Sequence, residues 1–402
     1  MANLSDFFAA ASGAPLPYQQ LVFGQSKTWT VGVSGRVKVI LTGGGGQGGY
    51  RDFSAGMAYD SATNRALATG GGAGGYCEKV FDVVAGETYT LVLGTGGDGN
   101  FDLQSSAQNR SGHNGGNSTF TTATAATSVA MTANGGTGGT GTFTVTADKL
   151  GGAGGTASGG DVNLTGGRGG NFTNSASHNG TTTFASGGGA VAVYGVGNHG
   201  GDLHVTGAIS NIISTGGAGV GGNGGGPDLP NAGYSNFQGY SGGSATRDGA
   251  QTGGNTGTSS TLSIKMPETA GAPNATNLLS QLDLQGRGGY GNFNGNASLS
   301  SVGQYGTNGG GGGGTVVYRT TATWSSQAGA GGSFAGGGGA IAIASNGQNW
   351  ATGQPQGNGA GGIGGGGSGG MCGKFYNMGA TASNTTPRLA GGGDGICIIM
   401  YV

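Results

Sequence analysis

Charged residues are scarce in this sequence. Lys, Arg, Asp and Glu together make up 8% of its 402 residues, and the formal net charge is -1, whereas about 25% charged residues is usual. Proteins that bind nucleic acid carry an excess of Lys and Arg to meet the phosphates. The composition therefore excludes nucleic acid as a partner.

Long apolar runs and an export signal are also missing. The longest apolar stretch is Ile396–Val402, far shorter than the roughly 20 residues of a membrane-spanning helix. The first residues lack a basic region and place Asp6 directly before Phe7 and Phe8, so they do not resemble a secretion signal. We expect no membrane insertion.

Proline and cysteine are few. Eight prolines, with no glycine at strict three-residue intervals, exclude collagen. The three cysteines, Cys77, Cys372 and Cys397, are widely spaced and form no CxxC pair. They fit neither a disulfide framework nor a zinc site, and they indicate assembly in a reducing cytoplasm.

Residues for catalysis are thinly spread. Four scattered histidines form no triad or HExxH motif, and the abundance of glycine makes GxGxxG matches uninformative. The segment NHGGDLH holds His199, Asp202 and His204, three residue types that ligate metals. A polar loop is the favoured interpretation of that segment, so we expect no catalytic residues, no metal and no cofactor, and hence no enzyme.

Glycine is what the sequence has in excess: 103 of 402 residues, against an average of roughly 7%. Most of it lies in runs of five to eleven residues at irregular spacing, such as Gly43–Gly49, Gly216–Gly226 and Gly361–Gly370. Backbones without Cβ atoms can pack closely and pair their N–H and C=O groups between neighbours. The favoured fold class is therefore mainly β and irregular: a bundle of glycine-rich polyproline-II helices with a small antiparallel β-sheet subdomain and variable loops. A mainly β architecture with glycine turns and a set of flexible linkers are the alternatives.

Four zones divide the chain. Residues 1–24 form a short attachment segment, and residues 25–134 alternate β-like runs with glycine. Within this second zone Thr28–Val31 and Val37–Leu41 are expected strands, and Val80–Val84 with Thr88–Leu93 has the alternation of a hairpin. Residues 135–395 are the expected bundle with surface loops, and residues 396–402 are a closing strand that could pair with Val37–Leu41.

Three stretches carry a resemblance to a known family. They are KTWTVGVSGRVKVILTGGGGQGG (Lys27–Gly49), AGGYCEKVFDVVAGETYTLVLGTGGDG (Ala73–Gly99) and GGGDGICIIMYV (Gly391–Val402). They resemble the glycine-rich domain of tailed-phage tail fibres, in which alternating Val strands run into polyglycine. The chain is also similar to the polyglycine-II tail-tip adhesins of T-even-like phages, whose variable loops bind bacterial outer-membrane proteins or surface sugars.

The resemblance implies a virion protein, assembled in the host cytoplasm and released by lysis. Its expected partners are a bacterial surface protein or glycan and other tail-fibre proteins, with the chain either a homotrimer or a monomer on a trimeric fibre. Phe7 and Phe8 are the candidates for attachment to the virion.

Specificity is expected from loops on a rigid scaffold. Aromatic side chains stack on sugars or fill apolar clefts, with Asn, Ser and Thr as hydrogen-bonding neighbours. Three loops combine these residue types, and their aromatic residues are Tyr234, Phe237, Tyr240, Phe293, Tyr305 and Trp350. For any one of them the alternative is that the ring covers an edge of the scaffold.

Three other functions were weighed against a receptor-binding protein. A virion decoration or connector protein of the head or tail is the main alternative. An ice-binding protein would need a flat, regular Thr/Ala face and shorter loops than these. A glycan-cleaving enzyme has little support, because paired carboxylates are scarce.

Overall fold

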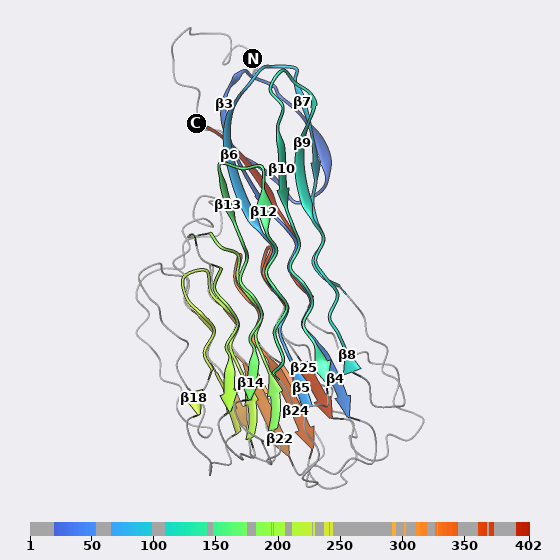
Figure 1. The fold of residues 1–402 in the computed structure, drawn as a ribbon, viewed down its shortest axis with the longest axis vertical. Helices are drawn as coiled ribbons and strands as arrows, with labels where there is room; N and C mark the ends of the chain where they lie inside the picture. Colours follow the sequence, from blue (N-terminus) through green and yellow to red (C-terminus); the bar gives the residue numbers. More distant parts are fainter. Residues whose placement is uncertain are drawn as a thin grey trace, which may run out of the picture.

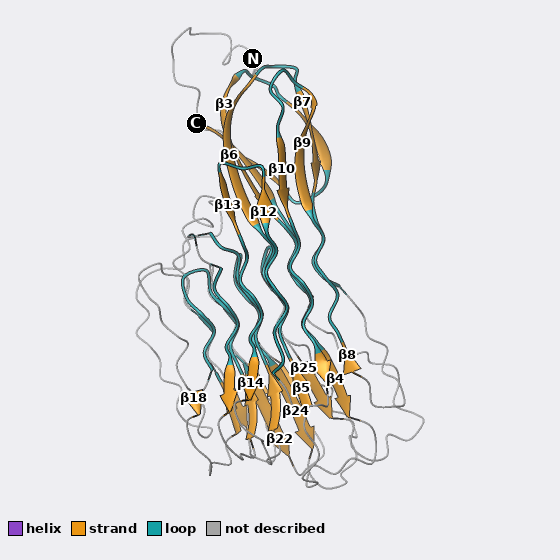
Figure 2. Ribbon diagram, viewed as in Figure 1, coloured by secondary structure: helices purple, strands orange, loops and turns teal. Residues whose placement is uncertain are grey.

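The computed structural model describes residues 20–53, 66–98, 109–142, 148–174, 182–193, 197–205, 211–226, 329–344, 361–367 and 391–402, with shorter pieces of 195, 228–229, 237–240, 242–243, 292–294, 301–302, 311–312, 314–319, 326–327 and 370–373. The described residues form six β-sheets and contain no helix. The molecule is elongated, with two sheets at one end, the other sheets at the far end, and long loop segments running between them (Figures 1 and 2).

Two five-stranded antiparallel sheets pack into a β-sandwich at one end of the molecule. Sheet 1 has the strand order β1 (Gln20–Phe23), β26 (Cys397–Tyr401), β3 (Gly35–Thr42), β6 (Tyr76–Val83) and β13 (Val162–Leu164). Sheet 2 has the order β12 (Ala157–Ser158), β10 (Ala130–Ala133), β9 (Ser118–Thr124), β7 (Thr88–Val92) and β2 (Lys27–Thr30). The alternation of β3, whose Val37, Val39 and Leu41 are fully buried, follows from one face of each strand meeting the other sheet.

An aromatic cluster fills the interior of the sandwich. Tyr89 stacks on Trp29 and on Phe120, with ring centroids 5.6 and 5.2 Å apart, and Phe81 packs against the same rings from sheet 1. Rings at these distances add to the stability that burial alone supplies. This core holds the sandwich together without any of the glycine segments.

The C-terminal strand is the centre of sheet 1. β26 pairs antiparallel with β3 in the register Cys397↔Leu41 to Tyr401↔Val37, and on its other side with β1. The pairing expected between residues 396–402 and Val37–Leu41 is therefore confirmed. The division of the chain into four zones stays a prediction.

The hairpin expected around residues 85–87 was wrong. β6 and β7 are consecutive in the chain, yet β6 pairs with β3 and β13 while β7 pairs with β2 and β9. The turn between them, in which Gly86 has a φ of +92° and the Glu87 N–H donates to Val84 O at 3.1 Å, carries the chain from one sheet to the other. Alternation shows that each strand has one buried face, and two such strands can face each other across a sandwich as well as pair side by side.

Short strands form the far end of the molecule. The largest sheet there has the order β20 (Asn292–Asn294), β22 (Thr315–Arg319), β24 (Ala340–Ala344), β25 (Gly370–Gly373), β4 (Tyr50–Phe53) and β8 (Asn109–Arg110). Next to it lie β11 (Gly141–Thr142), β5 (Ala66–Ala68), β15 (Thr182–Ala185), β17 (Asn211–Ser214) and β19 (Phe237–Gly239). The remaining two sheets consist of β14 (Phe172–Asn174), β16 (Leu203–Val205) and β18 (Asp228–Leu229), and of β21 (Ser301–Val302) with β23 (Ser326–Gln327).

Most strand pairs at this end are parallel, in contrast to the sandwich. β15, for example, pairs in parallel with both β5 and β17, and β24 pairs in parallel with both β22 and β25. A small apolar core of Leu67, Phe172, Phe184, Leu203, Ile213 and Tyr240 lies among the strands β5, β14, β15, β16 and β17 and the residue that follows β19.

The glycine runs connect the two ends as loop segments, and the expected bundle of polyproline-II helices is not found: the prediction of that fold class was wrong, although mainly β is correct. Each run continues from a β-strand, and its amides pair with other runs, as in Gly46 N to Gly72 O and Gly71 N to Gly367 O, both 2.8 Å. The composition required close approach of bare backbones, and close approach does not specify one helix type.

The closeness of these backbones can be measured at the missing side chains. A Cβ added to Gly71 would lie 2.1 Å from Gly46 O, and one added to Gly136 would lie 2.1 Å from Gly72 O. Real Cβ atoms do not approach carbonyl oxygens this closely. Glycine is therefore required at these positions by neighbouring backbone, with φ outside the left-handed region.

Apolar residues at the tips of glycine turns join the two ends. Val220 and Phe334 are buried, with Phe334 at a φ of +64°, and they belong to the same cluster as Ile40, Ile398 and Met400 of sheet 1. These turns cover the lower part of the outer face of sheet 1.

Candidate functional site

The far end is where the described strands lead into segments outside the described residues. The chain leaves β4 before residues 54–65, β14 before 175–181 and β16 before 206–210, and it returns to β5, β15 and β17. β1 and β26, which hold the two ends of the described chain, pair with each other in the sandwich instead (Figure 1). The two ends of the molecule thus differ: one holds the described chain ends and the other holds most of the connections between strands.

Tyr240 is the one expected binding residue whose side chain can be placed. It is 3% exposed and belongs to the small core with Phe184 and Ile213, and burial raises the pKa of its hydroxyl. Its ring is part of the far-end core, which corresponds to the alternative that the aromatic residue covers the scaffold. The three-residue spacing from Tyr234 carried no information about this burial.

Two other expected residues lie on neighbouring strands. Phe237 begins β19 and pairs with Ile212, and Phe293 lies in β20 and pairs with Val316. β19 lies against both β20 and β22, so the backbone brings these two positions to the same region. Tyr234, Tyr305 and Trp350, and the attachment candidates Phe7 and Phe8, lie outside the described residues.

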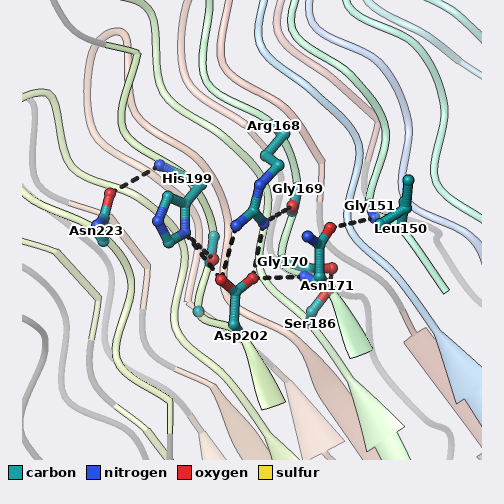
Figure 3. A network of polar contacts seen from close by, with 12 residues as sticks. Leu150, Gly151, Arg168, Gly169, Gly170, Asn171, Ser186, His199, Asp202 and Asn223 are labelled. Carbon is teal, nitrogen blue, oxygen red and sulfur yellow. Dashed lines mark hydrogen bonds and ion pairs between the residues drawn. The ribbon is translucent and has the colours of Figure 1, made fainter. Parts of the chain in front are cut away.

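A polar network lies on one side of the glycine segments (Figure 3). Asp202 receives two hydrogen bonds from the guanidinium of Arg168, both 2.7 Å, and a third from the Asn171 N–H at 2.7 Å. The His199 ring lies 3.5 Å from the same carboxylate, and the Asn223 side chain accepts from the His199 N–H at 3.0 Å. The two charged side chains are about one-third exposed.

This network does not form the metal site that the NHGGDLH segment suggested. The Asp202 carboxylate is occupied by Arg168, and His204 instead contacts the Thr173 hydroxyl through its Nδ1 at 2.7 Å. Within the described residues no group of three His, Cys, Asp or Glu could hold a metal ion. A carboxylate neutralised by a bidentate guanidinium is also a poor general base, so the network links neighbouring segments and has no catalytic geometry.

Sequence reasoning missed a second role of the polar residues between glycine runs. Their side chains accept hydrogen bonds from glycine amides: Gly151 N donates to Asn171 Oδ1, Gly70 N to Ser186 Oγ, and Gly135 N to Asn117 Oδ1, at 2.7–2.9 Å. A side chain thus replaces a missing backbone acceptor where no neighbouring run supplies one. A single Asn or Ser at the boundary of a glycine run is the signal that points to such a contact.

The described thiols are buried and unpaired with each other. Burial raises the pKa of the Cys77 thiol to about 12 and raises that of Cys397 as well. Thiolate is the reactive form of cysteine, so these two thiols are suited to packing in the sandwich core. The side chain of Cys372, in β25, lies outside the described ones.

A bilayer-spanning helix is not found in the described part of the chain. Among curated proteins no match to the sequence is found. The family model described as "Glycine-rich domain" matches residues 21–250, which is more than half of the chain and includes the whole of sheet 2 and most of sheet 1. On this match the chain belongs to the glycine-rich domain family.

Proposed function

We propose that this protein is a non-enzymatic adhesin of a tailed-phage virion, a tail-fibre or tail-tip protein that binds a bacterial surface protein or glycan. The sandwich end attaches to the virion, and the segments that connect the far-end strands contact the host. The resemblance of Lys27–Gly49 and Ala73–Gly99 to tail-fibre glycine-rich domains supports the virion assignment.

The separation of the two ends is the observation that carries the proposal. β1 and β26 pair in the sandwich, while β4, β14, β16 and β24 lead into their connecting segments at the opposite end (Figure 1). An attached protein that binds a distant surface needs this separation, because the anchor must leave the binding end free.

The glycine segments would give such an adhesin a rigid spacer. Their backbones are bonded to several neighbours at once: Gly72 accepts from Gly46 N at 2.8 Å and donates to Thr137 O at 3.0 Å. A rigid scaffold lowers the entropy lost when loops bind. The residues for recognition would be Tyr234, Tyr305 and Trp350 together with Phe237 and Phe293, with Tyr240 supporting them from the core.

The test has two parts. Antibody labelling of virions that carry the chain is expected to place it on the tail fibre, and purified protein is expected to bind the bacteria that these virions infect and to block their adsorption. Replacing Tyr234, Tyr305 and Trp350 by Ala should abolish this binding, whereas Thr28→Ala on the outer face of sheet 2 serves as the control and should bind normally.

Labelling on the head or along a connector, with no binding to cells, would contradict the adhesin and favour a decoration or connector protein. Unchanged binding by the triple variant would contradict the placement of the site at the far end.

A further inference from the structure

Exposed valines gather on the outer face of sheet 1. Val22 is 38% exposed, Val80 39%, Val162 41% and Val402 66%, and these are four of the seven large apolar residues exposed in the described part of the chain. We call this surface, with the residues between them, the valine face.

The strand register places these residues on one side of the sheet. Paired residues share a face, and one row across the five strands consists of Val22, Ile398, Ile40, Glu78 and Val162. The next row consists of Gln20, Met400, Lys38 and Val80. The residues that alternate with them, such as Leu41, Phe81 and Ile399, point into the sandwich core.

The outer face of sheet 2 provides an internal comparison. Its rows consist mainly of threonine, for example Thr28, Thr90 and Thr121 across β2, β7 and β9, and Val92 is the exposed large apolar residue there at 44%. Threonine suits a strand face in water because its hydroxyl stays hydrated and its branched Cβ favours a strand. The same sandwich therefore has one face suited to water and one that exposes valine, and contiguous apolar patches of this kind mark interaction sites.

The charges on the valine face balance each other. β3 supplies Arg36 and Lys38, and the adjacent β6 supplies Asp82 and Glu78, which form the ion pairs Arg36–Asp82 and Lys38–Glu78. A two-fold axis parallel to the strands and between β3 and β6 would set the positive strand of one copy opposite the negative strand of another. The face is thus complementary to itself in charge and in its apolar residues.

We propose that the valine face is the interface of a homodimer, in which sheet 1 of one copy packs against sheet 1 of a second. Sheets pack about 10 Å apart with strands nearly aligned, and identical patches are the requirement for a two-fold dimer. This proposal does not depend on the proposed function, because it concerns two purified copies of the chain.

The size of the face predicts a weak association. Five strands about 4.8 Å apart and three rows about 6.7 Å apart give at most about 500 Å² per copy, and therefore about 1,000 Å² for the pair. Specific interfaces begin near this total, and the turn tips over Ile40 and Ile398 reduce it further. Association is therefore expected to depend on concentration in the micromolar range.

The test compares two Val→Lys variants of the full chain by sedimentation equilibrium over a concentration series. Val80→Lys places a charge within the valine face, and Val92→Lys, matched in exposure, places one on the threonine face of sheet 2. The wild type and Val92→Lys are expected to dimerise equally, and Val80→Lys is expected to raise the dissociation constant at least about tenfold. Equal melting temperatures of the two variants confirm that folding is unaffected.

A second variant, Val402→Lys, tests the same face from another strand and should weaken association in the same direction. A wild type that stays monomeric up to about 0.5 mM would overturn the proposal, and so would a dimer that Val92→Lys disrupts and Val80→Lys does not.

Discussion

Replacing a glycine inside the central segments by alanine should destabilise the protein severely. In Gly71→Ala the new Cβ would lie 2.1 Å from Gly46 O and 2.5 Å from Gly46 C, and both atoms belong to backbone that cannot rotate away. An ordinary contact of about 3.4 Å would require a shift of more than about 1 Å in one of two hydrogen-bonded segments. Gly71 N is bonded to Gly367 O at 2.8 Å and Gly71 O accepts from Gly189 N at 3.0 Å, so the shift would lengthen bonds on both sides.

The magnitude follows from the number of bonds affected. A buried backbone group that loses its partner costs about 1–3 kcal/mol. With two or three such groups, Gly71→Ala is expected to lower the free energy of unfolding by about 3–6 kcal/mol. Gly312→Val should behave alike, because its Cβ would lie 1.9 Å from Gly329 O.

Gly32→Ala is the matched control. A Cβ at Gly32 meets no atom within 4 Å, and its φ is outside the left-handed region. Alanine there should be neutral or slightly stabilising, because it reduces the freedom of the unfolded chain. Urea denaturation followed by tryptophan fluorescence and circular dichroism gives the midpoints, and equal midpoints for Gly71→Ala and Gly32→Ala would refute the close packing of backbones.

Three further predictions concern the polar and buried groups. Asp202→Asn should lower the free energy of unfolding by about 1 kcal/mol, because it weakens the half-exposed ion pair with Arg168; the difference from wild type should shrink in 1 M salt, and a difference that is independent of salt would contradict an electrostatic origin. The Val84 N–H, as the largest of several contributions, lowers the pKa of Glu87 in the folded protein, so its contribution to stability is present above the ordinary Glu pKa and is lost as pH falls through and below it. Glu87→Gln should therefore lose less in melting temperature than wild type between about pH 6 and pH 3, and parallel pH profiles would exclude this contribution. Cys77 should resist alkylation at about pH 8 until the protein unfolds, because burial raises its pKa to about 12; rapid labelling of the native protein, followed by mass spectrometry, would show an exposed thiolate.

Much of the sandwich could be predicted from the sequence, because its strands alternate apolar and polar residues over enough positions. Val37–Leu41 and the C-terminal residues 396–402 were identified as strands and paired correctly with each other. The relation between β6 and β7 was not predictable in this way. Their pattern shows which side is buried and does not show whether the partner lies beside the strand or across the core.

The glycine segments could be predicted only in their close approach. Without side chains they have no hydrophobic period, so their neighbours cannot be assigned from pattern, and the pairing of Gly71 with Gly367 has no local signal. The candidate site had the same difficulty. Tyr240 has the composition of a loop around it, yet its position after β19 places the ring in the far-end core.

The position of β26 has a consequence for biosynthesis. It fills the gap between β1 and β3, and Ile396 N bonds to the Thr42 hydroxyl across 354 residues of chain. On a ribosome, β1 and β3 emerge early and must wait with two unpaired edges and half of a hydrophobic core until β26 has been made. Strands in this state are prone to join neighbouring chains, so we expect that nascent molecules need a chaperone or a slow, late closing step before the particle can use them.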